Sequence, residues 1–487
     1  MNKKRKILFP ILLLPLVISL SACNLKKNDS NPPEDEKPAD SEPVTPASDE
    51  PMVSIATNYF TERNSIYFSY TFDLKDFEII GDEPNINVLK MSMLFDANIS
   101  TGSKVIFNNT EYPVKGYDDV DSFYQHLGLD NLEKIDVVAK GEVDVDDVSY
   151  LNISHKKYEG KDICFVSIID SGVGTAWSSN FDLGLDDASY YDKTGEHPEW
   201  TNKDNHKGFD VTGNRIVEIL KDYKNRILDK NSQQIFYIFG HSRGGALANV
   251  VGAKLVDLDF EVASYGLASP AVTTSENASN EKYNHLYSYI NQQDSVTGIL
   301  SPGWGFKRYG KTFSFAIADY KEQFAAYNGF EFPTYQGINI SEVLQSICNG
   351  REEVYEISDE FTLFESSPLQ PDEVDNYIED KLAPLKDKYA SLRNYIEIEQ
   401  NSNDDDTITV VIKTCPAFII SALGKVISSA NGDSSSSLLS EVIGLSGFLD
   451  CFLKKAGIKL TDLLSFNFNY FAICHAFPSY LTYINLL

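Results

Sequence analysis

The chain has 487 residues, with 42 Lys and Arg against 71 Asp and Glu, which gives a formal net charge of −29 at pH 7. This length is sufficient for one large domain or two medium ones, with an ample core. The strong negative charge, which no basic stripe offsets, excludes nucleic acid as an expected partner.

The N-terminal residues predict where the protein is located. Four basic residues at 3–6 precede the apolar stretch 7–20, which is too short for a typical membrane-spanning helix. The pattern predicts a secretory signal peptide over residues 1–22. It ends in Leu20-Ser21-Ala22-Cys23, which resembles the lipobox of bacterial lipoproteins. The resemblance implies acylation of Cys23 and anchoring at the extracytoplasmic face of the cell membrane, and a plain secreted protein is the alternative.

The next segment, residues 23–52, is rich in Pro, Asp, Glu, Ser and Asn and has almost no apolar side chains to bury. We therefore expect a disordered tether. The cysteines beyond it are Cys164, Cys348, Cys415, Cys451 and Cys474. Their odd number, wide spacing and lack of a C-x-x-C pair argue against a disulfide framework or a metal site. A single disulfide is left as an alternative.

Residues 53–315 carry the pattern of an α/β domain. Short strands are expected at 66–70 and 105–107, followed by a short helix that ends near Gly128. From Ile163 onward, apolar runs alternate with amphipathic or small-residue segments; the expected strands are 164–169, 235–239, 262–265 and 286–290, and the expected helices are 213–228 and the segment after Gly244. This alternation predicts a mostly parallel sheet with helices on both faces.

The sequence Gly240-His241-Ser242-Arg243-Gly244 joins one of these strands to a helix rich in small residues. Strand, tight turn and helix form the context of a G-x-S-x-G nucleophile elbow, in which the serine lies on a strained turn. The flanking positions must be nearly free of side chains, because strand and helix approach closely there. The motif predicts Ser242 as a nucleophile, with an ordinary β–α turn as the alternative.

A serine nucleophile needs a base to accept its proton and an acid to orient that base. In α/β-hydrolases these follow the serine in the order acid, then histidine. Among the seven histidines only His475 follows every candidate acid, so chain order selects it as the base. Asp294 is the predicted acid because it follows the strand 286–290, at the carboxyl edge of the sheet, whereas Asp257 and Asp259 are expected to face solvent.

The transition state also requires N–H donors for its oxyanion. One donor is expected to be the backbone N–H of Arg243, directly after the nucleophile. The segment 170–177, which follows the strand 164–169, is placed to supply the second donor.

Further motifs occur in a fixed order along the chain. They are Asn205-His206-Lys207-Gly208-Phe209, the elbow run 240–248, and the segments 265–270, 291–296, 304–310 and 475–480. Together they resemble the class 3 lipase family, particularly its bacterial secreted members. The resemblance implies an α/β-hydrolase domain over 53–315 and 461–487, with Ser242, Asp294 and His475 as its catalytic triad.

The same resemblance places Ser171 where the family has the Ser or Thr of its oxyanion loop. The chain departs from the family here, because Ile169-Asp170 replaces Arg-Gly and the supporting hydrogen bonds must differ. We expect Trp177 and His206 to be structural, since acyl transfer requires neither.

Residues 316–460 form an insertion between the predicted acid and base, which we expect to be mainly helical. The expected elements are a charged amphipathic helix over 372–400 interrupted by Pro384, a strand over 407–413, and apolar helices over 417–430 and 438–456. The insertion is either a cap that binds acyl chains or an accessory subdomain packed on the core.

These residues predict a lipid-anchored extracellular serine hydrolase that cleaves carboxylic esters, with lipids as the expected substrates and without a cofactor or metal. A surface-displayed binding lipoprotein that keeps the fold without the chemistry is the rival hypothesis. Calcium sites at 144–147 or 404–406 are a third, but both runs lack the Gly and distal Glu of an EF-hand loop, and we interpret them as solvated turns.

Overall fold

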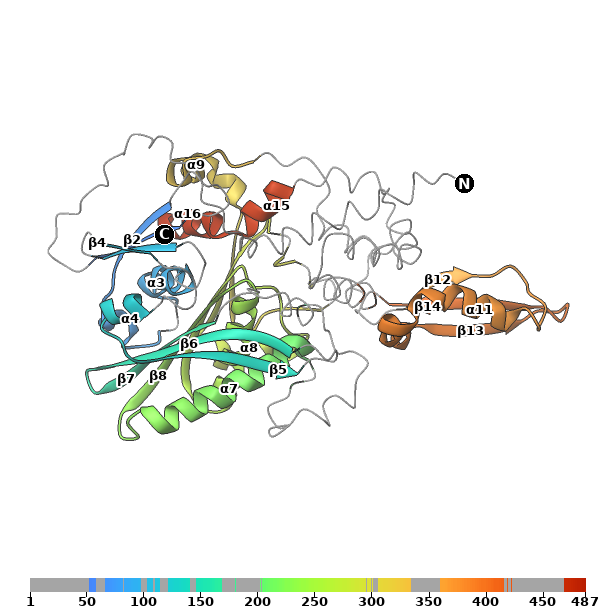
Figure 1. Ribbon diagram of the computed structural model, residues 1–487, viewed down its shortest axis with the longest axis horizontal. Helices are drawn as coiled ribbons and strands as arrows, with labels where there is room; N and C mark the ends of the chain where they lie inside the picture. Colours follow the sequence, from blue (N-terminus) through green and yellow to red (C-terminus); the bar gives the residue numbers. More distant parts are fainter. Residues whose placement is uncertain are drawn as a thin grey trace.

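Continuous apolar runs in the middle of the chain form the centre of a seven-stranded sheet in the computed structural model (Figure 1). The structure describes residues 52–57, 66–81, 83–97, 103–107, 110–113, 121–140, 146–168, 180, 202, 204–294, 296–298, 300, 305–333, 360–415, 418, 422 and 468–487. The predicted signal peptide and Cys23 lie outside these residues, as does the predicted tether apart from Met52. Within the described part, no helix is both long and apolar enough to span a membrane.

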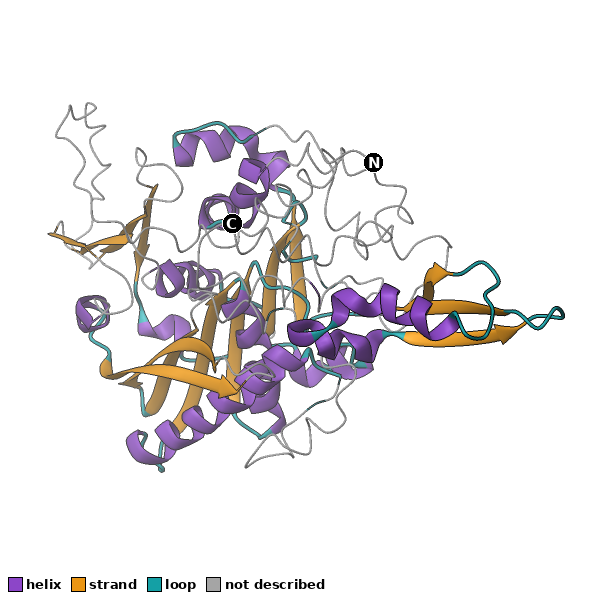
Figure 2. Ribbon diagram, turned by 45° about the vertical axis from the view of Figure 1, so that its right-hand side comes forward, coloured by secondary structure: helices purple, strands orange, loops and turns teal. Residues whose placement is uncertain are grey.

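The large sheet has the strand order β11-β10-β9-β8-β7-β6-β5. Its strands are β5 (Asp130–Lys140), β6 (Asp146–Tyr158), β7 (Lys161–Ile168), β8 (Gln233–His241), β9 (Glu261–Leu267), β10 (Leu286–Asn291) and β11 (Lys311–Phe315). Strands β7 to β11 are parallel, whereas β6 and β5 continue the sheet in antiparallel pairing (Figure 2). The predicted mostly parallel sheet is confirmed.

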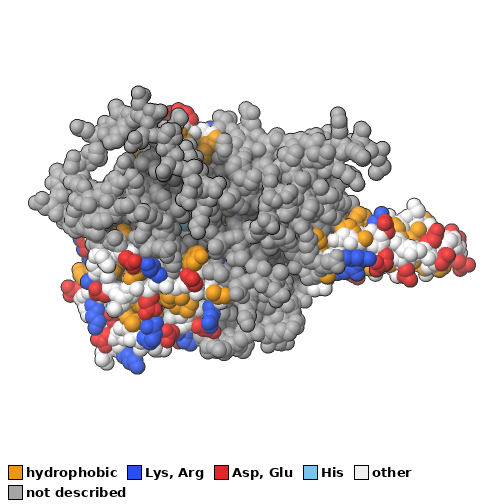
Figure 3. Space-filling view, viewed as in Figure 1, with side chains coloured by type: hydrophobic (Ala, Val, Ile, Leu, Met, Phe, Trp, Pro, Cys, Tyr) orange, Lys and Arg blue, Asp and Glu red, His pale blue; other side chains and the backbone are white. Residues whose placement is uncertain are grey.

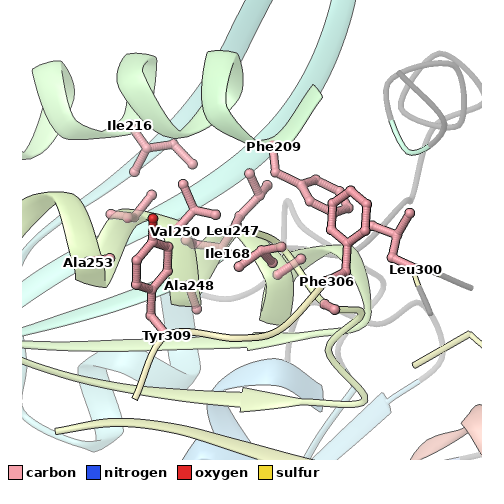
Figure 4. Packing of buried hydrophobic residues seen from close by; sticks show 14 of the residues in the cluster. Ile168, Phe209, Ile216, Leu247, Ala248, Val250, Ala253, Leu300, Phe306 and Tyr309 are labelled. Atoms are coloured by element: carbon pink, nitrogen blue, oxygen red, sulfur yellow. The ribbon is translucent and has the colours of Figure 1, made fainter. Parts of the chain in front are cut away.

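Side chains of β8 alternate between two hydrophobic cores, one on each face of the sheet. Phe236 and Ile238 pack with α7 (Lys207–Ile227) and α8 (Arg243–Asp257). Figure 4 shows this core, where Phe209 and Ile216 of α7 meet Leu247 and Val250 of α8. Ile235, Tyr237 and Phe239 pack with α3 (Ile86–Ala97) and α16 (Phe477–Leu486) on the other face. A strand covered on both faces reads as a continuous apolar run, as the sequence does here.

The remaining elements of the main body surround this sheet. They are β1 (Met52–Thr57), β2 (Ile66–Thr71), η1 (Leu74–Phe77), β3 (Ser103–Phe107), β4 (Thr110–Pro113), α4 (Asp121–His126), η4 (Glu276–Ser279), η5 (Glu281–Tyr283), η7 (Ile317–Tyr320), α9 (Lys321–Asn328) and α15 (Phe468–His475). The first four strands form a separate antiparallel sheet of order β2-β1-β3-β4. The C-terminal helix α16 packs against both α3 and α9.

Two elements of the predicted insertion 316–460, η7 and α9, pack against α16 as part of the main body. The other described elements of the insertion form a small sheet with helices. They are β12 (Phe361–Glu365), α11 (Val374–Leu382), η8 (Ala383–Leu385), η9 (Asp387–Tyr395), β13 (Glu397–Ser402) and β14 (Ile408–Thr414). The strands pair antiparallel in the order β12-β14-β13 and project from the main body (Figure 1), with acidic side chains toward the far end (Figure 3).

The prediction of a charged helix over 372–400 was wrong in its second half. Helix α11 ends at Leu382, just before Pro384, whose ring prevents a regular helix from continuing. From Glu397 the chain forms a strand that pairs with β14, which is itself the strand expected at 407–413. Of the two apolar helices expected further on, only Phe418 and Ala422 are among the described residues.

Candidate active site

Ser242 lies at the turn between β8 and α8, at the carboxyl end of the central parallel strands. Its φ of 55° and ψ of −122° place it in a region that L-residues rarely adopt, and its N–H donates to the carbonyl of Leu267 on β9 (2.8 Å). Gly240 makes this turn sterically allowed, because a Cβ there would lie 2.1 Å from the carbonyl oxygen of Gly244. The local geometry is therefore that of a nucleophile elbow, with the serine held on a strained turn.

Asp294 lies three residues after the end of β10, at the same edge of the sheet, and its side chain is fully buried. One carboxylate oxygen, Oδ1, accepts the N–H of Val296 (3.0 Å). The other, Oδ2, accepts hydrogen bonds from His475 Nδ1 (2.8 Å) and from the hydroxyl of Tyr480 (2.7 Å). Three donors therefore satisfy the acceptor atoms of this buried carboxylate.

His475 is the last residue of α15 and connects the other two side chains. Because its Nδ1 faces a carboxylate, which only accepts, the imidazole carries its proton on Nδ1. Its unprotonated Nε2 then accepts the hydroxyl of Ser242, at 2.8 Å from Oγ. The structure thus brings the three predicted residues into one hydrogen-bonded line.

Two residues around Asp294 were not assigned a role from the sequence. Tyr480 accepts the backbone N–H of Asn291 (3.1 Å) while it donates to Asp294, and burial together with that carboxylate raises its pKa well above the usual value. It therefore stays a protonated donor. The side chain of Asn291 donates to the carbonyl of Cys474 (3.0 Å), which holds the residue before His475. Both positions lie in motifs of the family resemblance, which was their only signal in the sequence.

Arg308 braces the loop that carries Asp294. Its half-buried guanidinium donates to the carbonyl oxygens of Ser269 and Thr297, at distances of 2.5 to 2.9 Å. Burial lowers the pKa of Arg308 to about 10, whereas Asp294 and Tyr480 nearby favour its charged form. The arginine thereby joins the segment after β9 to the segment after β10.

Of the two residues predicted for the oxyanion site, Arg243 is described and Ser171 lies outside the described residues. Arg243 is the first residue of α8, where backbone N–H groups point along the axis out of the helix. Its guanidinium, buried beneath the turn, donates to Asn180 Oδ1 (3.0 Å), Thr212 Oγ1 (3.2 Å) and Ser149 Oγ (3.4 Å). The side chain of Arg243 thus ties the elbow to α7 and β6, a role that the sequence did not indicate.

Two other ionisable groups near the site are held neutral. His206 is fully buried and stacks on Phe209 (4.2 Å between ring centroids), and burial together with the Arg243 guanidinium lowers its pKa to about 3. Burial raises the pKa of the Cys474 thiol, so this neighbour of His475 is no thiolate nucleophile at neutral pH. Trp177 lies outside the described residues. Within the part of the chain that is described, no cluster of His, Cys, Asp or Glu is suited to a metal ion.

The central part of the α/β domain is similar to a known protein family. Residues 174–303 match the class 3 lipase family. The match confirms the resemblance drawn from the motifs. The matched residues include Ser242 and Asp294, whereas His475 lies beyond them. No curated protein sequence matches the chain.

Three solved lipase structures are similar to this chain. A triacylglycerol lipase described as having a serine protease triad in its catalytic centre is 15% identical, with a TM-score of 0.31 over 47% of this chain and 80% of that one. The triacylglyceride lipase of Rhizomucor miehei is 14% identical, with a TM-score of 0.28 over 47% and 79%. The nonglycosylated LIP2 lipase of Yarrowia lipolytica is 16% identical, with a TM-score of 0.28 over 47% and 78%.

Proposed function

We propose that this protein is a serine hydrolase that cleaves carboxylic esters of lipids through an acyl-enzyme intermediate. The observation that carries the proposal is the hydrogen-bonded line from Ser242 Oγ through the His475 imidazole to the Asp294 carboxylate. This arrangement activates a hydroxyl as a nucleophile at neutral pH. The match of residues 174–303 to class 3 lipases supports lipid esters as the substrate class.

The proposal gives each residue a step in the reaction. Ser242 Oγ attacks the ester carbonyl carbon while its proton passes to His475 Nε2, and Asp294 stabilises the imidazolium that forms. The tetrahedral intermediate collapses when His475 returns the proton to the leaving alcohol, and water then attacks the acyl-serine by the same route. The N–H groups of Arg243 and Ser171 are proposed to stabilise the oxyanion.

A fluorophosphonate probe tests this proposal directly, because it phosphonylates only an activated serine. We expect one covalent adduct on the purified protein, located by mass spectrometry on the peptide that contains Ser242. The same sample is expected to hydrolyse p-nitrophenyl butyrate, and the labelled sample to have lost this activity. Heat-denatured protein serves as the control and is expected to take no label. A folded protein that neither reacts with the probe nor hydrolyses the ester would instead be a binding lipoprotein with a hydrolase fold.

We also propose that the protein is anchored by lipid at Cys23 to the extracytoplasmic face of the cell membrane. The supporting observations are the basic residues at 3–6, the apolar stretch that follows, and Leu20-Ser21-Ala22-Cys23. Stable anchoring needs more than one acyl chain, which an acylated N-terminal cysteine provides. The proposal places the hydrolase at a lipid surface, next to its substrates.

Replacing Cys23 with Ala in the full-length chain is expected to move the protein out of the membrane fraction, because the acylated thiol is lost. Detergent phase separation of expressing cells, followed by immunoblotting, measures this partition. Cys415→Ala is the matched control, since this partly exposed thiol lies far along the chain, and it is expected to leave the protein with the membrane. A Cys23→Ala protein that stays in the detergent phase would refute the anchor.

A further inference from the structure

The backbone of His475 is anchored by the residue that precedes the nucleophile. His475 ends α15, so its carbonyl is among the last four of the helix, which have no partner within the helix. His241 Nε2 lies 3.0 Å from this carbonyl oxygen. Because a carbonyl oxygen only accepts, Nε2 of His241 carries the proton and donates it.

The ring of His241 also packs against the segment that follows His475. It stacks on Phe477 (4.4 Å between centroids, 23° between planes) and meets Tyr480 edge-on (5.8 Å, 88°). The two histidine rings lie 5.1 Å apart. His241 is almost completely buried, so these contacts form away from solvent. One side chain of the elbow therefore touches the base, the aromatic residue after it and the tyrosine that binds Asp294.

These contacts matter because His475, the base, lies far along the chain from the other two residues of the triad. The bond from His475 to Asp294 joins positions 181 residues apart, and the bond to Ser242 joins positions 233 apart. Asp294 fixes the orientation of the imidazole, but it does not fix the distance between the His475 backbone and the elbow. The hydrogen bond from His241 fixes this distance, since His241 and Ser242 are consecutive residues. Asn291 holds the neighbouring Cys474 carbonyl in the same way from β10.

We propose that His241 is a positioning residue, which sets the distance between His475 Nε2 and Ser242 Oγ by donating to the His475 carbonyl. The inference rests on the proposed serine hydrolase function and concerns the same site. Loss of the bond lets the end of α15 shift relative to the elbow, and a displacement near 1 Å is sufficient to lower catalysis strongly.

Two amide variants separate the hydrogen bond from the packing of the ring. His241→Gln places an amide nitrogen at the same number of bonds from the backbone as Nε2, so it reaches the carbonyl. His241→Asn is one bond shorter and does not reach it. Both variants lose the stacking on Phe477. His241→Phe is the complementary variant, because it keeps the aromatic packing and loses the donor.

We expect kcat for p-nitrophenyl butyrate to fall by about 10- to 100-fold in His241→Asn and His241→Phe, with KM within about twofold of wild type. His241→Gln is expected to restore kcat to within about fivefold of wild type, and its labelling rate with the fluorophosphonate is expected to recover in parallel. Thermal unfolding is measured for each variant, and a loss through packing alone would affect the Gln and Asn variants equally.

Equal kcat values in the Gln and Asn variants, or a wild-type kcat in His241→Phe, would overturn the inference. Should His241→Phe fail to fold, the comparison of the two amides still decides the question. Failure of the proposed function gives a different result: in that case the wild-type protein itself is neither labelled at Ser242 nor active on the ester.

Discussion

Replacing Ser242 with Ala is expected to lower kcat for ester hydrolysis by on the order of 10⁶-fold and to abolish labelling by a fluorophosphonate. The change removes the only atom that His475 Nε2 activates, the Oγ at 2.8 Å. The remaining groups of the site act on substrate only through binding and oxyanion stabilisation, which leaves a small residual rate above that in water. Steady-state kinetics on purified protein measures the effect, and activity within about tenfold of wild type would exclude Ser242 as the nucleophile.

Ser242→Gly provides a structural control for this variant. Both replacements lack the hydroxyl, but Ala keeps the Cβ and with it the strain of a φ of 55° at this turn. Gly adopts this conformation freely, at the cost of greater freedom in the unfolded chain. We expect Ser242→Gly to be more stable than Ser242→Ala by about 1 kcal/mol in urea unfolding, although both are inactive. Equal stabilities would show that the elbow stores no strain at this position.

The sequence was sufficient to predict the centre of the fold and the three residues that meet there. The strands β7 to β10 are buried on both faces, so they appear as unbroken apolar runs. Their parallel order places the ends of β8 and β10 at one edge, where Ser242 and Asp294 lie. His475 was selected because no other histidine follows every candidate acid. Unbroken apolar runs and the order of residues along the chain can be read directly from the sequence, and they were enough for these residues.

The hydrogen-bond partners around the triad carry no such local signal. The bond from His241 to the His475 carbonyl joins positions 234 residues apart, and that from Tyr480 to Asp294 joins positions 186 apart. Which side chain meets which carbonyl depends on how α15 and α16 dock on the sheet. This docking is a property of the packed core, on the side of α3 and α16, and no motif spacing determines it.

Strand β6 was not predicted, although Leu151-Asn152-Ile153-Ser154 alternates apolar and polar side chains as a strand does. The polar side chains Asn152, Ser154 and His155 are buried as well as Leu151 and Ile153, so the burial of this strand could not be read from polarity. Helix α3 was missed because apolar residues occupy most of its sides and leave no amphipathic period.

The strand β13 was mistaken for helix because its partner decides its structure. Its sequence, EIEQNS, is charged and mostly exposed, a composition that favours helix over strand. Pairing with β14 reverses this preference, since Ile398 faces Ile412 and Glu399 forms an ion pair with Lys413. Cross-strand pairs of this kind stabilise a sheet only once both strands are in place.

Replacing Asp294 with Asn is expected to lower kcat by about 10⁴-fold while leaving the fold intact. In the wild-type protein, Oδ2 of the carboxylate accepts from His475 Nδ1 and the Tyr480 hydroxyl, and Oδ1 accepts the Val296 N–H. An amide has one accepting oxygen, so its NH₂ group must face a donor on one side. If it faces His475, the imidazole adopts the other tautomer, and an Nε2–H then points at Ser242, which can no longer transfer its proton.

The expected loss is smaller than that of Ser242→Ala, because the nucleophile and the oxyanion donors remain. Asp257→Asn is the matched control: it makes the same chemical change in a carboxylate that is about half exposed and bonded to Lys282, and it should leave kcat unchanged. Kinetics and fluorophosphonate labelling are measured on all three variants, with Ser242→Ala as the inactive reference. A kcat for Asp294→Asn within about tenfold of wild type would mean that the buried carboxylate does not set the tautomer of His475. The hydrogen bond between Asp294 and His475 would then have only a structural role.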